Sequence, residues 1–220
     1  MCANSCNLNY KLLLDYDGVV FNNPRAMKLV SNRSAQFVAN KLDMSFTNAR
    51  MVNSTRYKVH GHTVNYLNHI GVDTTLEEYN DFVFGKIDWN LIDLSICEDD
   101  YNRIINVQLL NQYQNQKSIL FTNAPYIWVE RTLEKIGTNP HVLFEDIYTC
   151  ENSVDMLKPN KNIYEHIESN YPETDLLFID DGYLNVQGLG ENWRTHLFRK
   201  DDDLYFAGRE LVDCRNYNYI

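Results

Sequence analysis

The feature that most constrains the fold is the segment KLLLDYDGVVF, which runs from Lys11 to Phe21. Its apolar opening predicts a buried strand that ends at Asp15. Two further apolar runs, Ser118 to Phe121 and Leu176 to Ile179, are also followed at once by polar residues. Buried strands of this kind are typical of a parallel sheet, because helices cover both faces of such a sheet. Ligands bind beyond the carboxyl ends of the strands in open parallel sheets, so these polar residues mark the expected site.

The segments that follow these runs have the pattern of helices. Ile127 to Ile136 is expected to be a helix, with Gly137 just past its end. A second helix is expected from Asn162 to Asn170, and weaker strand signals lie at Asp146 to Thr149 and at Thr195 to Arg199. Strands that alternate with helices predict an α/β fold with a parallel sheet covered on both faces.

The stretch between the first and second strands differs, because its signals are helical throughout. Apolar residues recur there at helical spacing, namely Met27, Val30, Phe37, Val38 and Leu42. Thr74 to Glu77 is typical of a capping box before a short helix that Gly85 would end. Tyr101 to Leu110 carries another helical stripe. We therefore predict a core of residues 1–22 and 117–220 and an inserted all-helical cap domain of residues 23–116.

Length and composition limit the function classes. A chain of 220 residues suffices for one large domain or for a core with one inserted lobe. No apolar stretch approaches the roughly 20 residues of a membrane-spanning helix, and residues 1–10 lack the apolar core of a signal peptide. We therefore expect a soluble, cytoplasmic protein that does not bind membranes. The net charge of −10 disfavours binding to nucleic acid polymers, whereas a bound metal ion would still permit a small anionic substrate.

Two acidic side chains, Asp15 and Asp17, follow the first expected strand. Residues two apart in an extended chain point to the same side, so both carboxylates would face one pocket. Adjacent carboxylates repel each other unless a cation joins them, and a partly protonated carboxyl group can act as a general acid. Gly18 would permit a tight turn away from the strand. The alternative is an ordinary solvated turn, since Asp-Gly pairs are common in turns.

Three further residues have the chemistry of phosphate binding. Thr122 and Asn123 follow the second expected strand, where a hydroxyl group and free backbone amides at a helix start suit a phosphate. The same residue types commonly serve only as helix caps. Lys158 would offset the negative charge of a phosphoryl group, and the alternative is an exposed loop lysine.

A second acidic pair, Asp180 and Asp181, ends the apolar run LLFI. Two acids at the end of a buried strand are costly unless they are paired or bound to a metal ion. Their oxygen atoms suit Mg²⁺ better than zinc. This pair therefore predicts a magnesium site, with a capped turn as the alternative.

The order of these clusters resembles the four motifs of the haloacid dehalogenase superfamily. They appear here as LLLDYDGVV, ILFTNA, MLKP and LLFIDDG. The resemblance implies a Rossmann-like core with a mobile helical cap, Mg²⁺ as the cofactor, and phosphoryl transfer through an aspartyl intermediate. It makes Asp15 the nucleophile and Asp17 the general acid and base, which also gives its backbone oxygen to the metal.

The same resemblance implies roles for the later motifs. Thr122 and Lys158 would hold the transferring phosphoryl group. Asp180 would ligate Mg²⁺, and Asp181 would orient a metal-bound water or ligate weakly. The chain is thus expected to hydrolyse a small phosphorylated metabolite.

The segment from Tyr57 to Leu67, YKVHGHTVNYL, is similar to the cap of pyrimidine 5′-nucleotidase-like members of the superfamily. This similarity implies a nucleoside 5′-monophosphate substrate. Arg56, His60 and His62 are candidate substrate contacts, although such residues are more often packing residues of a helical cap. Trp128 is expected in the hydrophobic core. A phosphomutase, a sugar-phosphate phosphatase and a non-catalytic binding protein on the same core stay open as alternatives.

Overall fold

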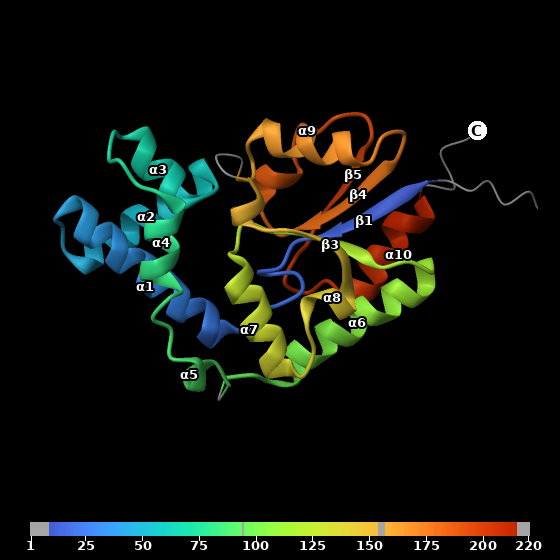
Figure 1. The fold of residues 1–220 in the computed structure, drawn as a ribbon, viewed down its shortest axis with the longest axis horizontal. Helices are drawn as coiled ribbons and strands as arrows, with labels where there is room; N and C mark the ends of the chain where they lie inside the picture. Colours follow the sequence, from blue (N-terminus) through green and yellow to red (C-terminus); the bar gives the residue numbers. More distant parts are fainter. Residues whose placement is uncertain (1–8, 94, 154–156, 215–220) are drawn as a thin grey trace, which may run out of the picture.

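The computed structural model describes residues 9–93, 95–153 and 157–214. Its centre is a five-stranded parallel sheet with strand order β3-β2-β1-β4-β5 and helices on both faces (Figure 1). The strands are β1 (Tyr10–Leu14), β2 (Ser118–Phe121), β3 (Phe144–Tyr148), β4 (Asp175–Asp180) and β5 (Trp193–Leu197). The predicted α/β, Rossmann-like fold is confirmed.

The strands predicted from apolar runs form the middle of the sheet. β1 pairs with β2 on one side and with β4 on the other, so that Leu14 lies beside both Leu120 and Ile179. The edge strand β3 begins at Phe144 rather than at Asp146, where the sequence predicted it. Two of its five residues are exposed, because an edge strand has a neighbour on one side only. Its apolar pattern is correspondingly weaker than that of a central strand.

The helices of the core divide between the two faces of the sheet. They are α6 (Glu98–Gln114), α7 (Tyr126–Ile136), α8 (Pro140–Leu143), α9 (Lys161–Asn170) and α10 (Leu204–Cys214), with the short 3₁₀ helices η1 (Cys150–Ser153) and η2 (Tyr183–Val186). Successive strand residues point to opposite faces. Leu12 and Leu14 accordingly pack with residues of α6, α7 and α10, whereas Leu13 packs with residues of α9. Figure 1 shows α9 on one side of the sheet and α6 and α10 on the other.

A group of helices lies between β1 and β2 in the sequence. They are α1 (Pro24–Leu42), α2 (Phe46–His60), α3 (Thr63–His69), α4 (Leu76–Val83) and α5 (Trp89–Asp93). We call α1 to α4 the cap helices, which form a separate layer beside the core in Figure 1. Side chains of Asn23, Ser45 and Thr75 accept hydrogen bonds from the first turns of α1, α2 and α4, as helix caps do.

The helix α6 falls within residues 23–116, which the sequence assigned to the cap, but it contacts α10, α8 and β2 of the core. The chain crosses between the cap helices and the core near Asn23. The Asn23 amide donates hydrogen bonds to the backbone oxygen of Ser95 at 2.5 Å and to Asp100 Oδ2 at 2.8 Å. The two segments that connect the cap helices to the core are therefore bound to each other, and the exact domain boundary stays a prediction.

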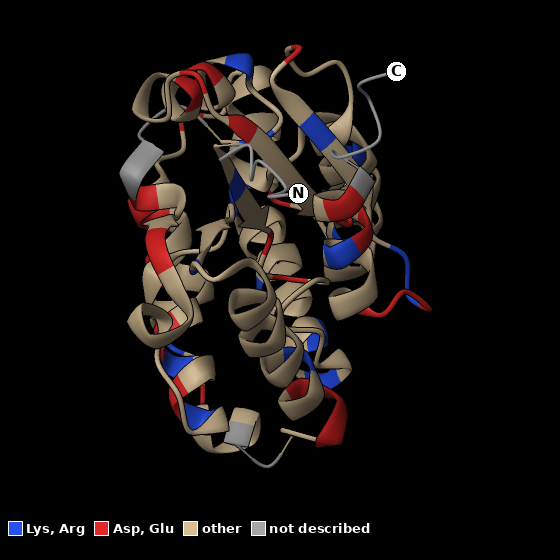
Figure 2. Cartoon of the chain, turned by 90° about the vertical axis from the view of Figure 1, so that its right-hand side faces the viewer, with Lys and Arg blue, Asp and Glu red and all other residues tan. Residues whose placement is uncertain are grey.

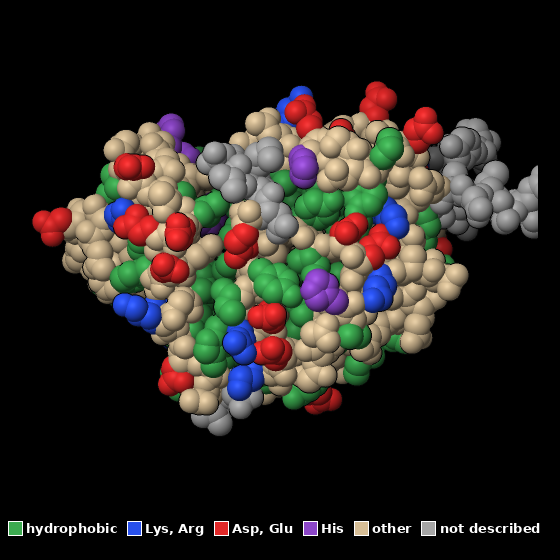
Figure 3. All heavy atoms as spheres, in the orientation of Figure 1, with side chains coloured by type: hydrophobic (Ala, Val, Ile, Leu, Met, Phe, Trp, Pro, Cys, Tyr) green, Lys and Arg blue, Asp and Glu red, His purple; other side chains and the backbone are tan. Residues whose placement is uncertain are grey.

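Charged side chains are spread over many elements of the surface. Figure 2 shows acidic residues on several helices and loops, interspersed with basic ones. In the view of Figure 3, acidic side chains alternate with small apolar patches. Among the helices that the structure describes, none is long and apolar enough to cross a membrane.

Candidate active site

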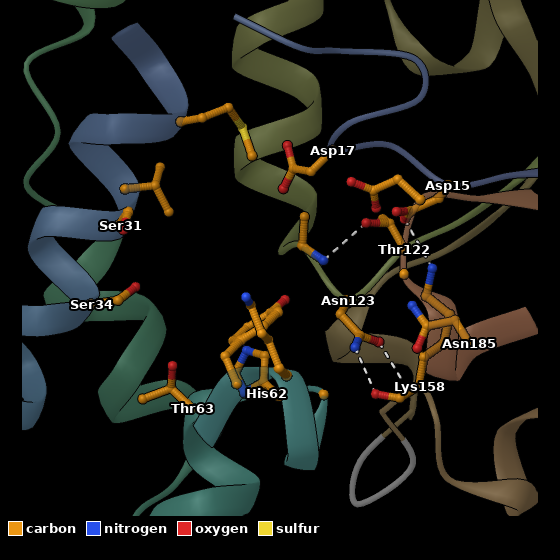
Figure 4. Close-up of a pocket in the computed structure, with 18 of the residues that line it drawn as sticks. Asp15, Asp17, Ser31, Ser34, His62, Thr63, Thr122, Asn123, Lys158 and Asn185 are labelled. Carbon is orange, nitrogen blue, oxygen red and sulfur yellow. Dashed lines mark hydrogen bonds and ion pairs between the residues drawn. The ribbon is translucent and has the colours of Figure 1, made fainter. Parts of the chain in front are cut away.

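The parallel register brings the polar ends of three strands together. Asp15 directly follows β1, Thr122 directly follows β2, and Asp180 is the last residue of β4. Lys158 joins them from the loop before α9. Figure 4 shows Asp15, Thr122 and Lys158 around one cavity. The four motifs identified in the sequence therefore converge at the carboxyl edge of the sheet, as expected.

Lys158 is the centre of this arrangement, with only 1% of its surface exposed. Its Nζ donates hydrogen bonds to Asp15 Oδ1 at 2.9 Å, to Asp180 Oδ2 at 2.5 Å and to the backbone oxygen of Phe121 at 2.9 Å. Burial alone would lower the pKa of Lys158, but Asp15 and Asp180 raise it above its usual value. The ammonium group therefore stays charged, and the alternative of an exposed loop lysine is excluded. Met156 of the same motif lies outside the described residues.

Asn123 and Thr122 lie beside Lys158 and make different hydrogen bonds. Asn123 Nδ2 donates to the backbone oxygen of Lys158, and the Lys158 backbone N–H donates to Asn123 Oδ1, both at 2.9 Å. Asn123 thus holds the lysine loop in place while it also lines the cavity. Thr122 Oγ1 accepts a hydrogen bond from the Ala124 N–H at 3.0 Å. The hydroxyl hydrogen of Thr122 is therefore free to be donated to a ligand in the cavity.

Three carboxylates form a group that fits a metal ion. One oxygen atom from each of Asp15, Asp180 and Asp181 lies within 4.8 Å of the others. Asp180 Oδ1 also accepts hydrogen bonds from the Gly182 N–H at 2.6 Å and from Asn185 Nδ2 at 2.9 Å, which fix its orientation. Hard oxygen ligands in such a group fit Mg²⁺. The side chain of Asp17 is not part of the group, and ligation through its backbone oxygen stays a prediction.

The electrostatics of the carboxylates favour the binding of a cation. Desolvation raises the pKa of Asp15 to about 7; Lys158 opposes this shift, while Asp180 and Asp181 add to it. Desolvation, together with the charge of Asp180, raises the pKa of Asp181 to about 6. One lysine does not balance three neighbouring acids, so a divalent cation would stabilise their ionised forms.

Asp17 is held by a residue that sequence reasoning did not place in the site. Trp128 Nε1 on α7 donates a hydrogen bond to Asp17 Oδ1 at 2.9 Å. Desolvation raises the pKa of Asp17 to about 7, and the indole hydrogen bond opposes that rise. Trp128 is fully buried, so the prediction of a core residue is confirmed. Nothing in the sequence distinguishes a core tryptophan whose N–H reaches a site from one whose N–H does not.

The loop after Asp17 is tightly packed and anchored from α6. Gly18 has φ +88°, and a Cβ atom there would lie 2.3 Å from Asp181 Oδ2, so a side chain does not fit. Arg103 Nη1 donates to the backbone oxygens of Gly18 at 3.1 Å and of Val19 at 2.6 Å. Arg103 was not predicted either, because its contact with the loop spans a large sequence separation.

The cavity extends from the acidic cluster to the cap helices and has a volume of about 750 Å³. His62 lines it, together with Asp15, Asp17, Lys158 and Asp181. The structure does not bring Arg56 or His60 to the described lining. The Arg56 guanidinium lies 5.9 Å from the ring centre of Tyr66, and His60 lies against His69 with ring centres 4.8 Å apart.

No family model and no curated protein matches this sequence. Three similar solved structures are a HAD phosphatase from Thermococcus onnurineus, a hydrolase from Streptococcus pneumoniae TIGR4 and a beta-phosphoglucomutase from Thermotoga maritima. The respective identities are 15%, 13% and 14%, and the TM-scores are 0.44, 0.43 and 0.49. The alignments cover 79%, 96% and 95% of this chain and 78%, 99% and 99% of the other chains. Because this likeness is too weak to argue from, the chemistry of the site rests on the residues of this chain.

Proposed function

We propose that this protein is a Mg²⁺-dependent phosphatase of the haloacid dehalogenase superfamily. It would hydrolyse a small phosphomonoester through a phosphoryl intermediate on Asp15. The observation that carries the proposal is the buried contact of Lys158 with both Asp15 and Asp180 at the edge of the sheet. A cation fixed between a candidate nucleophile and a candidate metal ligand is what phosphoryl transfer to a carboxylate requires.

The residues divide the first half of the reaction among them. Asp15 attacks phosphorus in line, so that a new bond forms to its carboxylate oxygen while the bond to the leaving oxygen breaks. Protonated Asp17 donates its proton to that leaving oxygen, which departs as an alcohol. Thr122 and Lys158 hold the phosphoryl oxygens and offset their charge. When bound by Asp15, Asp180 and Asp181, Mg²⁺ supplies charge neutralisation of the phosphoryl group.

In the second half, the carboxylate of Asp17 removes a proton from water. The water oxygen attacks phosphorus, and the bond to Asp15 breaks. Inorganic phosphate leaves, and both aspartates return to their starting protonation states. Trp128 keeps Asp17 in place through both halves, and closure of the cap would exclude bulk water from the acyl phosphate.

The substrate class is the finer part of the proposal. Nucleoside 5′-monophosphates are the first candidates, from the similarity of the cap segment, and the cavity volume is within the usual range for small-molecule sites. Sugar phosphates come next. A phosphomutase would share the same groups and differ only in the acceptor of the phosphoryl group, whereas a binding protein would share the fold without turnover.

Release of inorganic phosphate from a panel of nucleoside monophosphates and sugar phosphates tests the proposal. The assay is run with Mg²⁺, with a chelator, and with the Asp15→Asn variant. We expect release that needs Mg²⁺ and is abolished by the substitution. Isomerisation of a sugar phosphate without release would favour the mutase, and folded protein that is silent on the whole panel would contradict the proposal.

A further inference from the structure

The cap side of the cavity is lined by buried polar side chains without charge. Five of them come from four different segments of the cap and are each at most 8% exposed, namely Ser34, Asn53, His62, Thr63 and Tyr79. Figure 4 shows Ser34, His62 and Thr63 across the cavity from Asp15 and Lys158. Buried polar groups are costly unless they are hydrogen-bonded, so their partners decide what this end of the cavity can bind.

Four of these side chains form two hydrogen-bonded pairs, which together we call the network. The hydroxyl oxygens of Ser34 and Tyr79 lie 2.6 Å apart, and Thr63 Oγ1 donates to Asn53 Oδ1 at 2.9 Å. The Thr63 hydroxyl group opposes the rise in the pKa of Tyr79, so the two pairs act on each other. The network orients three hydroxyl groups and one amide without introducing a net charge. Hydroxyl oxygens retain acceptor capacity beyond a single bond, and an amide nitrogen has two hydrogens, so such groups can pair with the hydroxyl and carbonyl groups of a ligand.

His62 adds a neutral donor to the network. Its Nδ1 accepts a hydrogen bond from the Val64 N–H at 3.2 Å, so the proton of the neutral ring is on Nε2. Burial lowers the pKa of His62 to about 4, and the rings that face it are those of Tyr57 and Tyr79. At neutral pH His62 therefore offers an N–H group and not a cation.

The two ends of the cavity thus differ in charge. Asp15, Asp17, Asp181 and Lys158 line the end at the sheet. Among the described residues that line the cap side, Lys58 alone is charged at neutral pH, and it is exposed to solvent. Attraction by an exposed lysine is weakened by water and salt. An ionised group that entered the buried part of the cap side would lose its hydration without gaining a counter-charge, which is strongly unfavourable.

We propose that the cap side of the cavity binds an uncharged leaving group that carries hydroxyl or carbonyl groups, and that it rejects leaving groups with a second acidic group. The substrates would then be monophosphates of neutral sugars or nucleosides. Phosphorylated hydroxy acids and bisphosphates would be excluded. This inference rests on the proposed phosphatase activity, because it assigns the cap side to the alcohol that leaves when phosphorus is attacked.

Matched pairs of substrates test the inference directly. Uridine 5′-monophosphate and orotidine 5′-monophosphate differ by one carboxylate on the base, and glycerol 3-phosphate and 3-phosphoglycerate differ by a CH₂OH group in place of a carboxylate. We expect kcat/KM to be about 10-fold or more higher for the neutral member of at least one pair. Equal values within both pairs, or a preference for the acidic members, would overturn the inference.

Two variants distinguish the network from the exposed lysine. Thr63→Val removes a hydroxyl group and is expected to raise KM for the preferred neutral substrate about 10-fold, by loss of one hydrogen bond and of the network's orientation. Lys58→Gln, the matched control, is expected to leave the preference within each pair unchanged. If Lys58→Gln instead abolished the discrimination, the exposed lysine and not the neutral network would select the substrate.

Binding measurements separate this inference from the proposed function. Calorimetric titration of the Asp15→Asn variant with both members of each pair measures recognition without turnover. If the wild-type protein hydrolyses phenyl phosphate while the variant binds both members of each pair equally, the phosphatase proposal is supported and the inference about the cavity is overturned. Preferential binding of the neutral members without hydrolysis of any phosphate by the wild-type protein would support the inference about the cavity and overturn the phosphatase.

Discussion

The buried imidazole of His62 predicts a defined dependence of stability on pH. Burial lowers its pKa from the usual 6.5 to about 4, so between these values the unfolded chain binds a proton that the folded protein does not. Stability from the neutral ring is therefore fully present above pH 6.5 and is lost as the pH falls toward 4. The neighbouring Tyr57 and Tyr79 do not change charge in this range, because the pKa of each lies above the usual tyrosine value of 10. Substitution of His62 by a residue that does not titrate removes this contribution to the pH dependence of the unfolding free energy.

The size of the effect follows from the two pKa values. The difference between a pKa of 6.5 in the unfolded chain and about 4 in the folded protein corresponds to about 3 kcal/mol in the free energy of unfolding. This full amount separates a pH above both pKa values from a pH below both. Between pH 7 and pH 5 the unfolded ring becomes almost fully protonated while the folded ring stays neutral, so about 2 kcal/mol should be lost. Such a loss is a large part of the stability of an ordinary domain.

Urea unfolding at pH 7 and at pH 5 measures this loss. The wild-type protein is compared with His62→Gln, which retains a neutral donor, and with His69→Gln, which removes the exposed last residue of α3, the helix that His62 caps. The decrease in unfolding free energy from pH 7 to pH 5 should be about 2 kcal/mol smaller in His62→Gln than in the wild-type protein. His69→Gln should keep the large decrease, because His62 is still present. Identical slopes for His62→Gln and the wild-type protein would refute the reasoning.

Three further substitutions test the site. Lys158→Met leaves buried carboxylates without their cation and should abolish phosphate release. In Mg²⁺-free urea unfolding at pH 8, it should lower the free energy of unfolding by about 3 kcal/mol or more. Unchanged stability would contradict the buried pairing. Gly18→Ala places a Cβ atom against Asp181 and is strained at φ +88°. It should raise the Mg²⁺ concentration for half-maximal activity about 10-fold, which is the usual effect of disturbing the surroundings of a metal ligand. An unaltered Mg²⁺ titration would contradict the packing argument. Trp128→Phe removes the hydrogen bond to Asp17. It should lower kcat/KM about 10-fold for alkyl phosphates, and less for p-nitrophenyl phosphate, because that leaving group needs no proton. Equal losses on both substrates would indicate a purely structural role.

The strength of a pattern in the sequence decided how well each element was predicted. Ser118 to Phe121 forms β2 with the predicted bounds, because all four of its residues are buried. Gly137 follows α7 with φ +88°, in the left-handed conformation expected just past a helix end. The bounds of the edge strand β3 were not predicted correctly, and the contacts of α6 with the core were not anticipated. Their positions depend on which distant elements they meet, and local periodicity carries no information about that.

The sequence by itself determined the sheet, the helical insertion and the identity of the acidic, hydroxyl and lysine side chains at the strand ends. Parallel strands have their carboxyl ends at one edge, so local patterns suffice to bring such residues together. Only the tertiary structure decided that Lys158 is buried between Asp15 and Asp180. It also decided that Trp128 and Arg103 hold the loop of residues 17–19 that follows β1. It also decided that His62 and not His60 lines the cavity. These contacts join residues far apart in the chain, and they depend on side-chain directions that are set only when helices pack against the sheet.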